Sequence, residues 1–171
     1  MKRKTISILV VTLCLTGCAA RQKQVTNLPA GVTQAQVQNW DSAVANLDKI
    51  AQTVSTLRQA VITANQTMVT DSSGTHKLFP DGPAYVAFLT SIGRIDQLEI
   101  DSSAMLKAQP QNWGVDVQTK IKNNMALMQQ EIAAINSQGL IGIKSASAQA
   151  QVQQLTTNLS NLALLIVSLA T

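Results

Sequence analysis

The residues best suited to chemistry lie in one short stretch, where the sequence reads Asp71-Ser72-Ser73-Gly74-Thr75-His76. His76 is the only histidine of the chain, and as a general base it would need a serine nucleophile and an orienting carboxylate such as Asp71. Catalysis of this kind requires that a scaffold hold the three groups in a fixed order, which closeness in sequence does not supply. We therefore expect no catalytic residue and predict that the protein is not an enzyme.

Metal ligands are scarce along the chain. A single histidine excludes sites built on a histidine pair and di-iron sites of the Glu-x-x-His kind. The stretch 71–74 begins like a calcium loop but lacks the later carboxylates and the closing glutamate. Met125 and Met128, joined by Met68 and Met105, could offer thioethers to Cu(I), but they fall on apolar helical stripes, where methionine fills space. The sequence predicts no metal and no cofactor.

The densest acidic patch consists of Asp96, Glu99 and Asp101. On a helix, Asp96 and Glu99 share a face. Carboxylates in such positions are usually solvated, so we expect an exposed charged face and not a ligand site. The nucleophile motifs G-x-S-x-G and S-x-x-K and the phosphate-binding P-loop do not occur in the sequence.

Another reactive side chain is that of Cys18, which closes a segment with three parts. Residues 1–4 are cationic, residues 6–15 form an almost unbroken apolar run, and the small pair Thr16-Gly17 leads into the cysteine. This layout predicts an export signal. The apolar run is shorter than the roughly 20 residues of a membrane-spanning helix, so we do not expect a retained span.

The motif Leu15-Thr16-Gly17-Cys18 resembles the lipobox of bacterial lipoproteins, and this resemblance covers residues 1–18. It implies that the thiol of Cys18 receives a diacylglycerol, that the bond before it is cut, and that the new amino group is often acylated, for instance with palmitate. Two or more buried acyl chains anchor a protein stably. Ala19 does not resemble the Asp that retains lipoproteins in the inner membrane, so the resemblance implies the outer membrane, facing the periplasm. The alternative is an ordinary signal peptide with an incidental cysteine.

Cleavage before Cys18 changes the charge and the cysteine count of the chain. The signal carries three of the 13 basic residues and none of the nine acidic ones, so the mature chain is near +1 and has no basic stripe for nucleic acid. Cys14 leaves with the signal and Cys18 becomes a thioether, so no disulfide is expected. The mature length of about 150 residues fits one domain.

The sequence divides into a signal peptide (1–17), a lipidated tether (18–32) and a helical domain (33–171). Pro29 and Gly31 interrupt a tether that has no apolar period, which predicts a flexible segment. Turn-forming residues predict a long loop over 71–83. Apolar residues at gaps of three and four predict helices over about 33–68, 84–107, 113–137 and 145–169, with Thr33 and Ser145 as N-caps. The first of these is one long helix or two collinear pieces.

Four amphipathic segments without alternating strands predict an all-α fold, an antiparallel four-helix bundle with a long first helix. Trp40 and Trp113, near the start of two helices, are expected in the interior. Residues 162–169 are apolar nearly all round, so we expect this end to be deeply buried or to meet another subunit.

Two functions remain open at this point. The first is a non-enzymatic, lipid-anchored module that contacts the membrane through the lipid on Cys18 and binds another envelope protein or itself. The second is a small-ligand-binding or hydrolytic protein that uses the 71–83 loop. Fold class does not decide between them.

Overall fold

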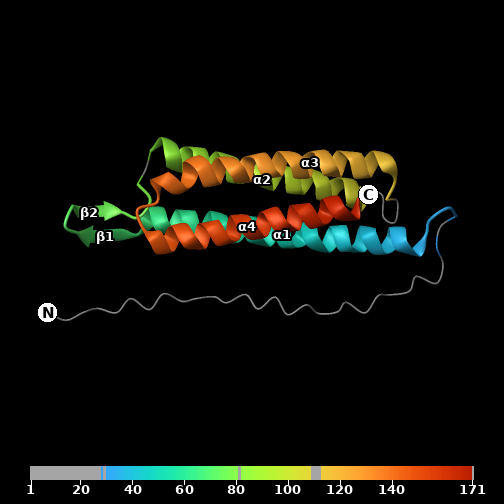
Figure 1. Cartoon of the computed structure of the whole chain (residues 1–171), viewed down its shortest axis with the longest axis horizontal. Helices are drawn as coiled ribbons and strands as arrows, with labels where there is room; N and C mark the ends of the chain where they lie inside the picture. Colours follow the sequence, from blue (N-terminus) through green and yellow to red (C-terminus); the bar gives the residue numbers. More distant parts are fainter. Residues whose placement is uncertain (1–27, 29, 81, 109–112, 171) are drawn as a thin grey trace.

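The computed structural model describes residue 28 and residues 30–80, 82–108 and 113–170 (Figure 1). The signal peptide, Cys18 and most of the tether lie outside these residues, as does Asp81 of the 71–83 segment. Helices dominate the described part of the chain, so the expected all-α fold class is confirmed, with one small hairpin as an addition.

Two of the four long helices begin at the predicted caps. Helix α1 spans Gln34–Gln66 after Thr33, whose hydroxyl accepts a hydrogen bond from the Gln36 amide while the Gln36 side chain accepts one from the Thr33 amide. Helix α4 spans Ala146–Leu169, and the hydroxyl of Ser145 accepts a hydrogen bond from the Ala148 amide. Both side chains satisfy helix-end N–H groups that have no partner within the helix.

The remaining helices are α2, Pro83–Ala108, and α3, Val115–Ala134. A π-helical turn, Ile135–Gly139, and a 3₁₀ turn, Leu140–Gly142, follow α3. The predicted third helix continued to about residue 137, and the π-helical turn takes the place of its end. Gly139 and Gly142 end these two turns, and each lies against an aromatic ring, that of Phe88 and that of Phe79 respectively.

Residues 68–77 correct the sequence prediction, because they form a β-hairpin where we expected a helix end and a loop. Strand β1, Met68–Asp71, pairs antiparallel with β2, Gly74–Lys77. Helix α1 therefore stops at Gln66, and Met68, expected on its buried face, is 57% exposed. The Phe79 amide donates to the Ala64 carbonyl and the Lys144 amide to the Leu78 carbonyl, which fixes the hairpin against the helices.

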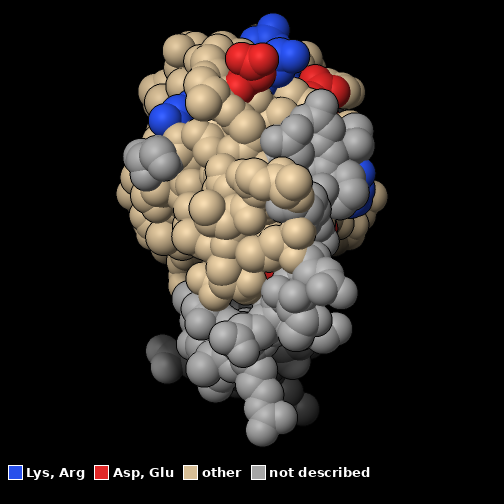
Figure 2. Space-filling view, turned by 90° about the vertical axis from the view of Figure 1, so that its right-hand side faces the viewer, with Lys and Arg blue, Asp and Glu red and all other residues tan. Residues whose placement is uncertain are grey.

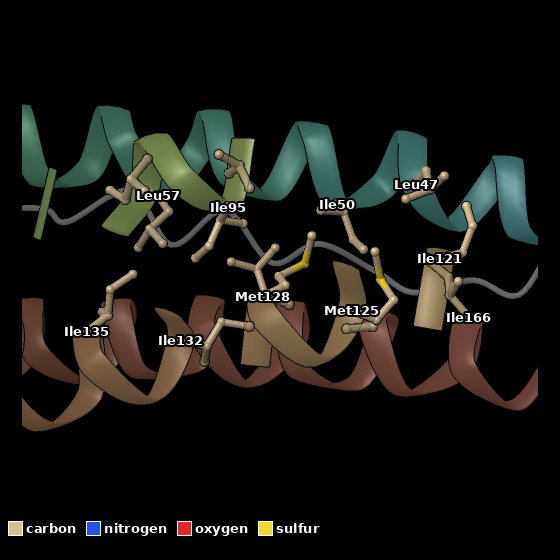
Figure 3. Packing of buried hydrophobic residues seen from close by; sticks show 14 of the residues in the cluster. Leu47, Ile50, Leu57, Ile95, Ile121, Met125, Met128, Ile132, Ile135 and Ile166 are labelled. Carbon is tan, nitrogen blue, oxygen red and sulfur yellow. The ribbon is translucent and has the colours of Figure 1, made fainter. Parts of the chain in front are cut away.

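The core runs the length of the helices, and side chains from all four meet in it (Figure 3). Most of the apolar residues that recur at gaps of three and four are buried, as predicted. The core also contains residues that do not belong to this pattern. Burying one such side chain stabilises the fold by about 1.5–3 kcal/mol. The added buried residues include Ala43, Ile50, Phe79, Ile143 and Ala163.

Helix ends meet where α1 begins. The indole N–H of Trp40 donates to the Leu106 carbonyl at 3.2 Å, and that of Trp113 to the Leu169 carbonyl at 2.9 Å. These bonds join the ends of α2 and α4 to the starts of α1 and α3, because the last carbonyls of a helix lack partners within it. Both tryptophans pack with the core, as expected.

The last turns of α4 are not deeply buried, which corrects one of the two expectations for residues 162–169. Ala163 and Ile166 are buried, but Leu164 is 56% and Leu165 51% exposed. Contact with another subunit stays a prediction. Among the described residues, none of the helices combines the length and the apolar character that crossing a bilayer requires.

Candidate functional site

The hairpin gives Asp71 and Ser73 a fixed geometry. Asp71 pairs with Gly74 in the strand register, and Gly74 takes the positive φ of 109° that the tight turn needs. Oδ1 of Asp71 accepts hydrogen bonds from the Ser73 amide at 2.8 Å and from the Ser73 hydroxyl at 2.5 Å. The carboxylate therefore holds the turn together.

His76 lies on the other side of the same carboxylate, with Nε2 3.6 Å from Oδ2 of Asp71. In a serine hydrolase the histidine stands between the serine and the acid, so that it can take the hydroxyl proton. Here Asp71 stands between Ser73 and His76, and the serine proton is already donated to the acid. The structure thus brings three of the predicted chemical groups together in an order that does not activate the hydroxyl.

A shallow, open depression of about 390 Å³ borders the hairpin. Its lining includes Ser73 and His76 from the hairpin, Pro80 from the segment that leads to α2, and Lys144 from the segment before α4. The cationic Lys144 and the titratable His76 face a mostly solvated space. This geometry fits transient contact with a polar or anionic group better than enclosure of a ligand, because binding sites usually bury most of the ligand surface.

Hydrogen bonds from the Ser73 side chain and amide lower the pKa of Asp71, with a smaller contribution from His76. The folded turn is therefore stabilised by the charged carboxylate above the unfolded pKa of about 3.9, and this is lost as the pH falls through the lower folded pKa. We expect Ser73→Ala to raise the pKa of Asp71, measured by NMR titration of its carboxyl carbon. Ser72→Ala is the control, and an equal rise in both variants would contradict this assignment.

Three of the four methionines in the described part of the chain lie in or against the core. Met125 and Met128 are fully buried in the core and Met105 packs against it, which confirms the predicted space-filling role, whereas Met68 is on the hairpin. Among the described residues, no group of three or more histidine, cysteine, aspartate or glutamate side chains is placed to hold a metal ion.

The acidic patch on α2 corrects the expected solvated face. Asp96 forms an ion pair with Arg58 of α1 at 2.8 Å, and Asp101 accepts a hydrogen bond from Gln97. Glu99, however, is only 7% exposed and accepts a hydrogen bond from the Ser103 hydroxyl at 2.6 Å. The buried face of α2 is wider than a single apolar stripe, so it includes position 99.

The polar contacts between α2 and α3 were not predicted from the sequence. The hydroxyl of Ser91 and the guanidinium of Arg94 both donate to Glu131 of α3, at 2.7 and 3.0 Å. Farther along these helices, the side-chain amide of Asn124 donates to the buried hydroxyl of Ser102. Because a buried polar group without a partner is costly, these pairs fix how the two helices face each other.

Comparison of the chain with protein-family models, with curated proteins and with solved structures gives no significant match in any of the three. The motif at residues 15–18 lies outside the described residues.

Proposed function

We propose that this chain is a lipoprotein of the bacterial cell envelope, anchored by acyl chains on Cys18 in the outer membrane, with its helical domain facing the periplasm. The observation that carries this proposal is the motif Leu15-Thr16-Gly17-Cys18 after a cationic start and a short apolar run. In this proposal the domain is a non-enzymatic module that binds an envelope protein or a second copy of itself.

We also infer that the helices form an antiparallel four-helix bundle. Helix α1 packs against α2 and α4, and α3 packs against the same two helices. The bonds from Trp40 to the end of α2 and from Trp113 to the end of α4 support opposite directions for the neighbouring helices. Side chains from all four helices fill one common interior, as such bundles require (Figure 3).

The anchor predicts a clear result for Cys18→Ser in cells fed with labelled palmitate. The wild-type chain is expected to carry the label and to sediment with membranes, because acyl chains partition into lipid. The variant is expected to lose the label and to persist as the uncleaved precursor. Globomycin, which blocks the lipoprotein signal peptidase, should also make the wild-type precursor accumulate. A wild-type chain that is released unlipidated into the growth medium would refute the anchor.

The alternative function is a small-ligand-binding or hydrolytic protein, and the depression at Ser73, His76, Pro80 and Lys144 is the observation in its favour. We rank it second for two reasons. The order serine, aspartate, histidine does not activate the hydroxyl, and the depression is open to solvent.

A further inference from the structure

The tether of the proposed lipoprotein enters the domain at one defined place. Thr33 caps α1 through reciprocal hydrogen bonds with Gln36, so the chain that comes from Cys18 meets the helices at the start of α1. The end of α4 lies there as well, because Asn39 and Trp113 both donate to the Leu169 carbonyl. We call this region the tether end, and the opposite region, which carries β1 and β2, the hairpin end (Figure 1).

The number of residues between Cys18 and the cap limits how far the tether end can lie from the lipid. Fourteen residues lie between Cys18 and Thr33, and a fully extended chain that joins the two spans at most about 50 Å. Helix α1, with 33 residues, is itself about 50 Å long. The hairpin end could therefore face the bilayer only if the whole tether ran fully extended back along α1.

The tether end exposes apolar side chains beside a few charged ones: Asp116, next to Val115 in the first turn of α3, is exposed, as is Lys107 in the last turn of α2. Val115, in the first turn of α3, is 77% exposed, and the exposed Leu164 and Leu165 lie in the last two turns of α4. Figure 2 views the molecule from this end: most of the described surface there is uncharged, and nearly all the visible Lys, Arg, Asp and Glu atoms lie near its margin. Surfaces of this kind favour the boundary between lipid headgroups and acyl chains.

We propose that the tether end rests on the bilayer surface, with Val115, Leu164 and Leu165 in contact with the lipid interface and the hairpin end directed away from the membrane. This inference depends on the proposed lipid anchor. Three apolar side chains add little to the membrane affinity that the acyl chains provide. The contact therefore orients the domain, while the acyl chains keep it at the membrane. The hairpin end then lies about 50 Å from the lipid, by the length of α1, where an envelope partner can reach it.

The hairpin end also exposes apolar side chains, and these provide the control. Ile141, in the turn before α4, is 73% exposed, close to the 77% of Val115. The two residues are β-branched, similarly accessible and near opposite ends of the helices. A probe at either position therefore differs mainly in its distance from the tether.

The test uses the full chain, lipidated in cells and reconstituted into vesicles of phosphatidylethanolamine and phosphatidylglycerol. The thiol of Cys18 is blocked by lipid in the mature protein, so Val115→Cys and Ile141→Cys each offer one thiol for an environment-sensitive fluorophore. Lipids with a nitroxide near the headgroup then quench the probes that lie at the interface. We expect quenching at least about twofold stronger at Val115→Cys than at Ile141→Cys, because only the former probe touches lipid.

The possible failures are distinguishable. If both labelled chains float with the vesicles but are quenched equally, or if Ile141→Cys is quenched more, the orientation is overturned while the anchor stands. If the wild-type chain takes up the thiol label at Cys18 or does not float with the vesicles, the anchor itself is refuted, and the orientation with it.

Discussion

Replacing Leu159 by Asp is expected to unfold the helical domain. The side chain of Leu159 is fully buried, in the middle of α4 and within the common core. The substitution removes about 1.5–3 kcal/mol of apolar burial and places a carboxylate without a partner in the interior, which costs several kcal/mol more. Small domains are stable by only about 5–15 kcal/mol. We expect the variant to lose most of its helical circular dichroism signal, or to unfold at far lower urea concentration.

Leu164→Asp is the matched control, because it makes the same exchange on the same helix at a position that is 56% exposed. The intrinsic helix preference changes equally in both variants, so the difference between them reports burial, apart from a small effect of the helix dipole. Exposed substitutions usually change stability by less than about 0.5 kcal/mol, and the negative charge near the C-terminus of α4 adds a similarly small penalty. If Leu159→Asp unfolds at the same urea concentration as this control, α4 does not contribute residue 159 to the core.

The helices were predictable because their signal extends over many turns. Each predicted stripe contains at least six apolar positions at gaps of three and four, and a pattern of that length outweighs local irregularities such as the β-branched run Val61-Ile62-Thr63. Thr33 and Ser145 were predictable as caps because each comes directly before an apolar period and its hydroxyl can bond to the next turn.

The hairpin was not predictable by the same reasoning. Its strands have only four residues each, too few for an alternating pattern to stand out, and Met68 continues the apolar period of α1. Tertiary contacts hold the strands in place. The side chain of Phe79 is fully buried, and its backbone amide donates a hydrogen bond to the Ala64 carbonyl near the end of α1. These contacts join residues that are far apart in the sequence, so a local sequence pattern cannot predict them.

The sequence predicted no catalytic site at Asp71, Ser73 and His76, and the order of these groups in space could not be predicted from it. The sequence placed Asp71, Ser73 and His76 close together, and the structure does the same. Which group stands in the middle depends on the turn at Gly74 and on the register that aligns His76 with Val69. The burial of Glu99 escaped prediction for a related reason, because the hydroxyl of Ser103, which makes that burial tolerable, carries no signal in the sequence.

The second large effect is expected at Gly139, where a single methyl group should destabilise the fold. A Cβ atom added there would lie 2.4 Å from Cδ2 of Phe88, closer than atoms can approach. The backbone of Gly139 has φ −71° and ψ −42°, which any residue adopts, so glycine is needed for space and not for conformation. The ring of Phe88 is buried and packs edge-to-face against Phe79, so it has little room to move. We expect Gly139→Ala to lower the free energy of unfolding by about 1–3 kcal/mol.

Gly93→Ala is the control with the opposite expected sign. Gly93 lies in the middle of α2 with nothing within 4 Å of an added Cβ. Alanine there should raise the free energy of unfolding by about 0.5–1 kcal/mol, because glycine loses more backbone freedom in a helix. Both variants would be measured by urea unfolding with far-ultraviolet circular dichroism. A Gly139→Ala variant that is stabilised as much as Gly93→Ala would show that the π-helical turn does not pack against Phe88.

Combining Gly139→Ala with Phe88→Leu separates a clash from a general loss of packing. Leucine fills much of the same space without the ring edge that meets the new methyl group, and Phe88 supplies all three of the nearest atoms to a Cβ at position 139. If the clash is the cause, the double variant should be less destabilised than the sum of the two single variants by at least about 1 kcal/mol, since residues in contact couple by roughly 0.5–3 kcal/mol. Additive effects would instead mean that the turn tolerates alanine by shifting away from α2. The hairpin would then shift as well, because Phe79 packs between Phe88 and Gly142.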